Sequence, residues 1–93
     1  MAFWVYVLEC ADGSYYVGHT DNPERRVAQH DSGEVPGYTT NRRPVRLKWS
    51  ETLATREEAL AAEFRIKGWS RAKKEALMVG DWARVSQLAR NRQ

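Results

Sequence analysis

The sequence predicts an α+β fold in which a small three-stranded antiparallel β-sheet is flanked by helices. Segments rich in β-branched and aromatic residues alternate with polar turns, and helix-start signals precede the remaining apolar stretches. The expected strands are residues 3–9, 15–19 and 45–51. The expected helices are about 23–31, 56–67, 71–78 and 82–90. Because 93 residues suffice for one hydrophobic core, we expect one domain over 1–93 with the order β-β-α-β-α-α and an extra C-terminal helix.

The first two strands form a predicted hairpin whose turn contains Gly13. If Gly13 takes the left-handed conformation of a three-residue loop, Tyr6 pairs with Gly18. Tyr16 then lies on the same face of the sheet as Tyr6. A two-residue turn at Asp12 and Gly13 would place the two tyrosines on opposite faces, since a register slip of one residue moves every side chain of a strand to the other face of the sheet. We predict the three-residue loop.

The first helix begins after a strong start signal at residues 21–24, where a capping side chain precedes a proline and an acidic residue. Arg26 and His30 are one turn apart, so they project from the same face. A histidine near a helix end often only caps or lies at the surface. Its near-neutral pKa also suits proton transfer, and both interpretations remain open.

The third strand is predicted from the alternation of Val45, Leu47 and Trp49 with polar residues, which should give it one buried face. Residues 55–58 then match a capping box, Thr-Arg-Glu-Glu, which opens the second helix. Two shorter helices follow, and Gly80 separates them.

Glu63 is the most unusual residue of the second helix. At about 100° per residue it falls near the middle of an apolar arc that includes Leu60 and Phe64. An unpaired buried charge costs several kcal/mol, so we expect a cation beside Glu63. A salt bridge to Arg26 or another base is one possibility. The other is Mg²⁺, which commonly takes one carboxylate together with water and phosphate oxygens.

The charge of the chain favours a polyanionic partner. There are 15 Lys and Arg against 12 Asp and Glu, and residues 42–48 contain four basic side chains and no acidic one. The alternative is an ordinary solvated face. The one cysteine, Cys10, forms no internal disulfide, and no apolar run approaches the ~18 residues of a membrane span. We therefore expect a cytoplasmic protein with no membrane partner.

Five sequence features occur in an order that is typical of one protein family. They are Trp4-Val5-Tyr6, Tyr16-Val17-Gly18, Arg26, His30 and Glu63. In this order they resemble the GIY-YIG nuclease family, which includes homing endonucleases, restriction enzymes and excision-repair incision proteins. The resemblance extends from Phe3 to about Leu77 and is closest to the small stand-alone bacterial subgroup. The first motif has Trp4 where the family has glycine.

The resemblance implies phosphodiester hydrolysis in nucleic acid, with DNA favoured over RNA, using one divalent ion, Mg²⁺ or Mn²⁺. Tyr6, helped by His30, would be the general base, and Tyr16 would position the phosphate. Arg26 would stabilise the charge of the transition state, and Glu63 would hold the metal. A tyrosine of pKa near 10 is a poor base, so we expect the neighbouring charges to lower the pKa of Tyr6.

The predicted function is that of a monomeric endonuclease of low sequence specificity with a role in DNA repair. Residues expected to contact nucleic acid are His19, Tyr38, Thr39, Arg42, Arg43, Arg46 and Lys48. One alternative is a catalytically weak or inactive module that binds nucleic acid, and its binding should weaken with added salt. A second alternative is an adaptor that uses Trp69 and Trp82 to meet a protein partner.

Overall fold

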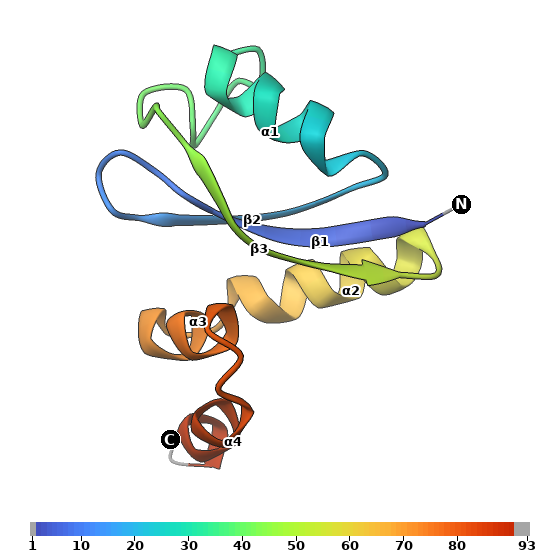
Figure 1. Cartoon of the computed structure of the whole chain (residues 1–93), viewed down its shortest axis with the longest axis vertical. Coiled ribbons are helices and arrows are strands. Elements are labelled where there is room, and N and C mark those ends of the chain that lie inside the picture. Colours follow the sequence, from blue (N-terminus) through green and yellow to red (C-terminus); the bar gives the residue numbers. More distant parts are fainter. Residues whose placement is uncertain (1, 91–93) are drawn as a thin grey trace.

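The computed structural model describes residues 2–90 and shows a three-stranded sheet between helices (Figure 1). The elements are β1 (Phe3–Glu9), β2 (Tyr15–Thr20), α1 (Pro23–Ser32), β3 (Arg46–Leu53), α2 (Arg56–Lys67), α3 (Arg71–Met78) and α4 (Trp82–Arg90). This order and the antiparallel pairing confirm the predicted fold class. Residues 1 and 91–93 of the predicted domain lie outside the described residues.

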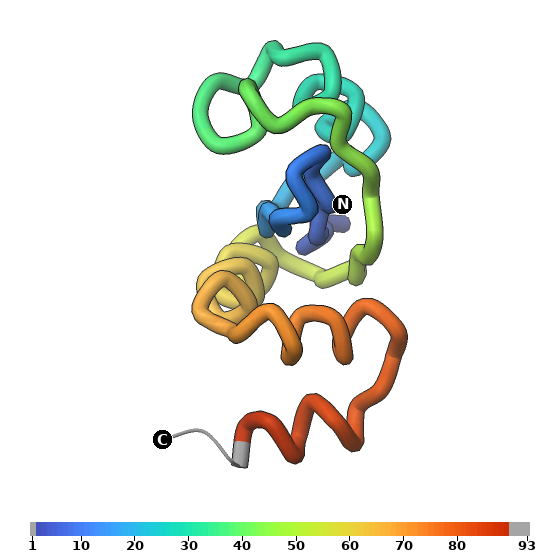
Figure 2. The backbone as a smooth tube through the Cα atoms, turned by 90° about the vertical axis from the view of Figure 1, so that its left-hand side faces the viewer, coloured from blue at the N-terminus to red at the C-terminus, as the bar shows by residue number. Residues whose placement is uncertain are grey.

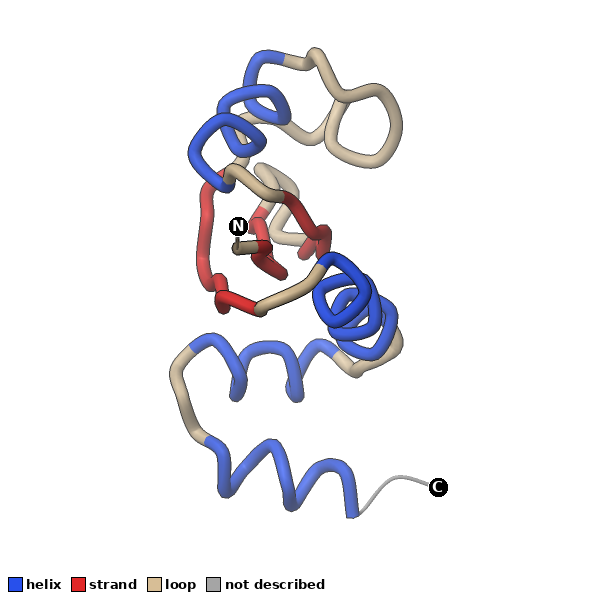
Figure 3. Tube along the Cα trace, turned by 90° about the vertical axis from the view of Figure 1, so that its right-hand side faces the viewer, coloured by secondary structure: helices blue, strands red, loops and turns tan. Residues whose placement is uncertain are grey.

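Helix α1 covers one face of the sheet, and α2 covers the other, as Figure 3 shows with the strands in red between them. Helices α3 and α4 stack on the side away from α1 (Figure 2). The strand order is β2-β1-β3, so β1 is central and β2 and β3 are edge strands. Each end of α1 and the start of α2 carry the caps that their sequences predict.

The β1–β2 hairpin has the predicted three-residue loop. Gly13 has a φ of 84°, a left-handed conformation that favours glycine. The register pairs Tyr6 with Gly18 and Leu8 with Tyr16. Tyr6 and Tyr16 therefore lie on one face of the sheet, the face that α1 covers.

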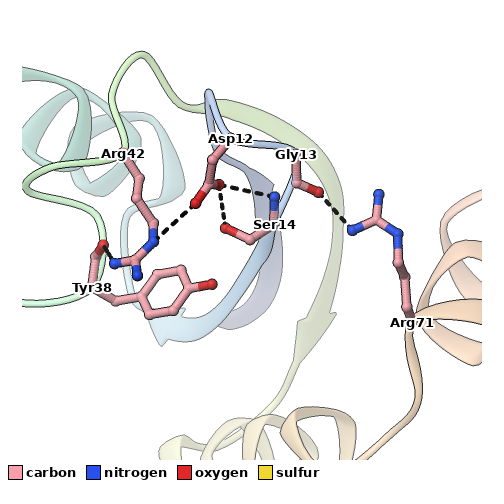
Figure 4. A network of polar contacts seen from close by, with 6 residues as sticks. All are labelled: Asp12, Gly13, Ser14, Tyr38, Arg42 and Arg71. Carbon is pink, nitrogen blue, oxygen red and sulfur yellow. Dashed lines mark hydrogen bonds and ion pairs between the residues drawn. The ribbon is translucent and has the colours of Figure 1, made fainter.

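The tip of this hairpin is held from two sides (Figure 4). On one side, the Asp12 carboxylate accepts hydrogen bonds from the Ser14 backbone N–H at 3.0 Å and from Arg42 Nε at 3.1 Å. On the other side, Arg71 of α3 donates from Nη1 to the Gly13 carbonyl oxygen at 2.6 Å. The loop after α1 and helix α3 thus fix the turn that sets the register of the hairpin.

Strand β3 departs from the predicted alternation. Its register against β1 shifts between Val7, which pairs with Trp49, and Leu8, which pairs with Leu47. The extra residue, Lys48, is typical of a β-bulge. Consequently Leu47 and Trp49 lie on opposite faces, and Leu47 is 42% exposed. The prediction that both belong to one buried face was wrong because a bulge changes the parity of the strand.

Two buried clusters lie on the two faces of the sheet. The larger one joins the sheet to α2, α3 and α4 and consists of Val5, Val7, Val17, Ile66, Ala76, Leu77 and Val85. The smaller one lies under α1 and consists of Tyr6, Leu8, Cys10 and Val45. Because successive residues of β1 point to opposite faces, this one strand contributes to both clusters. Tyr6 is thereby buried within the smaller cluster.

Candidate active site

The candidate site surrounds the edge strand β2. Tyr6 and Tyr16 lie on the α1 face of the sheet, whereas His19 points to the α2 face and contacts Glu63. An edge strand lets side chains from the two faces approach one another around its open side. The chemistry-bearing residues are therefore divided into two halves, one on each face.

Gly18 is required by the close approach of Tyr6. A Cβ atom added at Gly18 would lie 2.6 Å from Cζ of Tyr6 and would overlap its hydroxyl oxygen. It would also lie 3.2 Å from Cε2 of Tyr16. The side chain of Tyr6 thus crosses directly over the backbone of the edge strand, which only a residue without a side chain permits.

A chain of hydrogen bonds links Tyr6 to the interior. The hydroxyl oxygen of Tyr6 is 3.0 Å from Nε2 of His30, and Nδ1 of His30 is 2.9 Å from Oγ1 of Thr39. All three side chains are buried. Burial, followed by the charge of Arg26, lowers the pKa of His30 below its usual 6.5. In the neutral imidazole, an Nε2 that accepts from Tyr6 leaves an N–H at Nδ1 to donate to Thr39.

The pKa of Tyr6 moves in the direction opposite to that expected. Burial raises it to about 12, although Arg26 partly opposes this effect. The prediction that neighbouring charges lower the pKa of Tyr6 was wrong. Desolvation of the phenolate raises this pKa by more than the charges of the neighbouring side chains lower it. Tyr6 therefore keeps its proton at neutral pH and accepts another only if it passes its own to His30.

Arg26 reaches this half of the site from α1, one turn before His30, as predicted. Its charge acts on both Tyr6 and His30. Its side chain donates from Nη1 to Oε1 of Gln29 at 3.3 Å. Within residues 2–90, no carboxylate pairs with Arg26. The guanidinium group can therefore bind an anion.

The other half of the site is centred on Glu63 of α2. One carboxylate oxygen lies 2.7 Å from Nδ1 of His19, and the other lies 2.9 Å from Nζ of Lys67. Burial raises the pKa of Glu63, but the hydrogen bonds from His19 and Lys67 outweigh it and the pKa is lowered. The predicted cation is present, but it is not Arg26. Lys67 was missed, although its i,i+4 spacing from Glu63 is a recognisable signal for such a pair.

The predicted position of Glu63 within an apolar arc needs correction. Helix α2 packs through Ala59 and Ile66, whereas Leu60 is 50% and Phe64 is 82% exposed. Glu63 lies at the border between the packed and the exposed stripe, with 15% of its side chain exposed. Helix α2 is therefore rotated relative to the prediction, with Ala59 and Ile66 rather than Leu60 and Phe64 on its packed side.

The two halves meet beside the ring of Tyr16. Nζ of Lys67 lies 5.8 Å from the centre of that ring, and the ring of His30 lies 5.0 Å away. The charge of Glu63 also contributes to the raised pKa of Tyr6. The ring centre of Tyr38 lies 5.9 Å from that of Tyr16, and Tyr38 is 41% exposed, so it forms the rim of the candidate site. The predicted catalytic residues therefore gather in one place.

The residues predicted to contact nucleic acid are dispersed. Thr39 is 1% exposed and hydrogen-bonded to His30, so its predicted contact is wrong. Arg42 is committed within the chain, because Nε binds Asp12 and Nη1 binds the Tyr38 carbonyl oxygen at 2.6 Å. Arg43 donates from Nε to the carbonyl oxygen of Thr40 at 3.1 Å. These side chains form hydrogen bonds that hold the loop after α1 in its conformation. Composition alone does not reveal that they are occupied in this way.

Arg46 and Lys48 lie on β3, the edge strand opposite β2. The central strand β1 separates them from the candidate site. Their predicted role in binding nucleic acid stays a prediction, but they do not adjoin the tyrosines. His19, by contrast, lies within the site because it pairs with Glu63.

The site offers few ligands to a metal ion. Within residues 2–90, no three His, Cys, Asp or Glu side chains form a cluster that could hold one. Glu63 is ionised at neutral pH because its pKa is lowered, and a carboxylate has more lone pairs than His19 and Lys67 use. One carboxylate completed by water and phosphate oxygens is a common Mg²⁺ site. The residues present fit an ion held in that way.

Comparison with known proteins identifies relatives over most of the chain. The family model described as the GIY-YIG catalytic domain matches residues 2–76. A UPF0213 protein of Halobacterium salinarum is 51% identical over 73 residues, which are 78% of this chain and 95% of that protein. A UPF0213 protein of Bacillus pumilus is 47% identical over 72 residues, 77% of this chain and 74% of that protein.

Two solution NMR structures share the fold. That of a UPF0213 protein from Bacillus halodurans has a TM-score of 0.55 and 43% identity, covering 85% of this chain and 84% of the other. That of a protein from E. faecalis has a TM-score of 0.59 and 38% identity, covering 89% and 88%. Within residues 2–90, no helix has the length and apolar character to span a membrane.

Replacing Gly18 by alanine should displace Tyr6. The added Cβ meets the phenol ring, so we expect a loss of about 1–3 kcal/mol in the free energy of unfolding from overpacking. NMR should also show the His30 ring signals shifting as the hydrogen bond to Tyr6 breaks. Gly68→Ala is the matched control, since its Cβ would make only an ordinary contact at 3.6 Å. Equal stability and an unchanged His30 spectrum in Gly18→Ala would contradict the close approach.

Proposed function

The chain belongs to the GIY-YIG family, within its UPF0213 group, and we propose that it is a metal-dependent endonuclease that hydrolyses phosphodiester bonds in nucleic acid, DNA in preference to RNA. One observation carries the proposal: the Tyr6–His30 hydrogen bond and the Glu63 carboxylate lie on either side of one edge strand, with Arg26 beside them. These are a proton acceptor, a metal ligand and an anion-binding group. Contacts of this kind recognise phosphate rather than base sequence, which supports low sequence specificity.

The proposed reaction begins with a phosphodiester bound against Arg26 and oriented by the hydroxyl of Tyr16. Tyr6 accepts a proton from the attacking water and donates its own to Nε2 of His30, so the phenolate never accumulates. Oγ1 of Thr39 can accept the Nδ1–H of the imidazole in the tautomer that this transfer requires. Arg26 stabilises the charge on the phosphate as the transition state forms. Glu63 would hold a Mg²⁺ or Mn²⁺ ion, which would supply neutralisation of the negative charge that develops in the reaction.

A second candidate is a module that binds nucleic acid without cutting it. It is favoured by the ion pairs of Glu63, because His19 and Lys67 already occupy both carboxylate oxygens and would compete with a metal. The raised pKa of Tyr6 favours it as well. In that case the tyrosines would be structural, and binding would depend strongly on salt.

Nuclease assays on supercoiled and branched DNA distinguish these candidates. We expect the wild type to cut with Mg²⁺ or Mn²⁺ and not with EDTA. Glu63→Ala, Arg26→Ala and Tyr6→Phe should each reduce the rate by about 10²–10⁴-fold. Glu57→Ala and Arg65→Ala, exposed changes on α2, serve as charge-matched controls and should retain the wild-type rate. A wild type that never cuts, or variants that all cut alike, would refute the nuclease; a salt-sensitive gel shift without cutting would favour the binding module.

The pH dependence of cleavage tests the Tyr6–His30 relay. His30 accepts the proton only when neutral, and its pKa lies below 6.5, so activity should be constant near neutral pH and decline only below 6.5. If Tyr6 acted alone as a phenolate, its pKa of about 12 would make the rate climb by about tenfold per pH unit through the alkaline range. Single-turnover rates at saturating metal measure the difference, and such a climb would contradict the relay.

A further inference from the structure

A hollow of about 350 Å³ opens beside the candidate site, at the end of β2. Its lining includes Arg25 and Arg26 of α1 and Arg56 at the start of α2. His19 and Asn22 complete the part of the lining that matters here. Three arginines from two helices therefore border one depression.

These three arginines differ from Arg42 and Arg71, because no ion pair among the described residues neutralises their charges. In the described part of the protein, Arg25, Arg26 and Arg56 form no ion pair. Arg42 and Arg71, by contrast, are tied to the hairpin tip in Figure 4 and pair with Asp12 and Glu75.

The surroundings of the hollow keep its electrostatic potential positive. The guanidinium group of Arg56 lies 4.7 Å from the centre of the Phe3 ring, which holds it near the hollow without cancelling its charge. The first turn of α1 also borders the hollow and contributes the positive end of its dipole. Asp21 is the one acidic residue in the lining, and it lies in no ion pair with the arginines in the described structure. Like charges held together around a depression favour a bound anion.

The hollow adjoins the place where a phosphate would be cut. Arg26 and His19 belong both to its lining and to the candidate site. A nucleic-acid strand carries one negative charge on each successive phosphate. A strand whose phosphate lies against Arg26 brings its next phosphate close to that arginine. The adjoining hollow is lined by Arg25 and Arg56, whose positive charges can receive it.

We propose that Arg25 and Arg56 form a second phosphate subsite, which binds the phosphate adjacent to the one that is cut on the same strand. This inference rests on the proposed function and adds the path of the substrate. The strand follows the β2 edge from the tyrosines toward the start of α2, and it does not cross Arg46 and Lys48 on the far edge. The substrate must then extend at least one nucleotide beyond the cleaved bond.

Competing double variants test this path. In a Glu63→Ala background that does not cut, Arg25→Ala/Arg56→Ala is compared with Arg46→Ala/Lys48→Ala, which removes the same charge from the other edge. Fluorescence anisotropy of a short labelled single strand, measured over a salt series, reports affinity. The first pair should weaken binding about tenfold and reduce the slope of log K against log salt by about 0.7, the loss of one phosphate contact. The second pair should change both quantities less than the first; equal effects, or a larger effect of the second pair, would overturn the subsite.

A titration with inorganic pyrophosphate tests the hollow independently of cleavage. The Nε–Hε NMR signals of Arg25, Arg26 and Arg56 should shift together, while that of Arg65 should not. If the wild type cuts DNA but these signals do not move and the Arg25/Arg56 pair binds normally, the subsite fails and the nuclease stands. If the wild type does not cut although pyrophosphate shifts the signals, the nuclease fails and the anion site stands. Both arginines are exposed, and unchanged thermal unfolding of the double variant verifies its fold.

Discussion

The crossing of Tyr6 over Gly18 is the contact on which the candidate site depends. It exists because the loop at Gly13 sets a register that places these two residues opposite each other. A slip of one residue would turn Tyr6 to the α2 face and away from His30. Asp12 and Arg71 secure the turn at a distance from the chemistry, so packing at the hairpin tip determines the geometry at the other end of the strands.

The two halves of the site have different electrostatic character, and each suits its proposed task. On the α1 face, burial raises the pKa of Tyr6 and lowers that of His30, so both are neutral and a proton can move between them without creating a lasting charge. On the α2 face, Glu63 keeps its charge because His19 and Lys67 surround it. Strand β2 separates the buried Tyr6–His30 pair from the ionic and more accessible region around Glu63. A substrate at the β2 edge would contact both.

Local features could be predicted from the sequence, and features created by tertiary contacts could not. The hairpin turn and the helix caps depend on neighbouring residues, so Gly13 and Thr55 were sufficient signals. The bulge at Lys48 and the rotation of α2 arise from packing between elements that are distant in sequence. The hydrogen bond of Thr39 to His30 likewise depends on how the loop after α1 folds. Basic composition was a poor guide, because Arg42 of the basic run pairs with Asp12, whereas Arg25 and Arg56 lie outside that run and line the hollow.

Titration with paramagnetic Mn²⁺, followed by NMR, tests most directly whether the two faces form one metal-dependent site. The account predicts that signals of His19 and Glu63 broaden first, followed by those of Tyr6 and His30 across the edge strand, and that Glu63→Ala abolishes this localised effect. Broadening confined to the acidic residues of other surfaces, or broadening that is unchanged in Glu63→Ala, would contradict it.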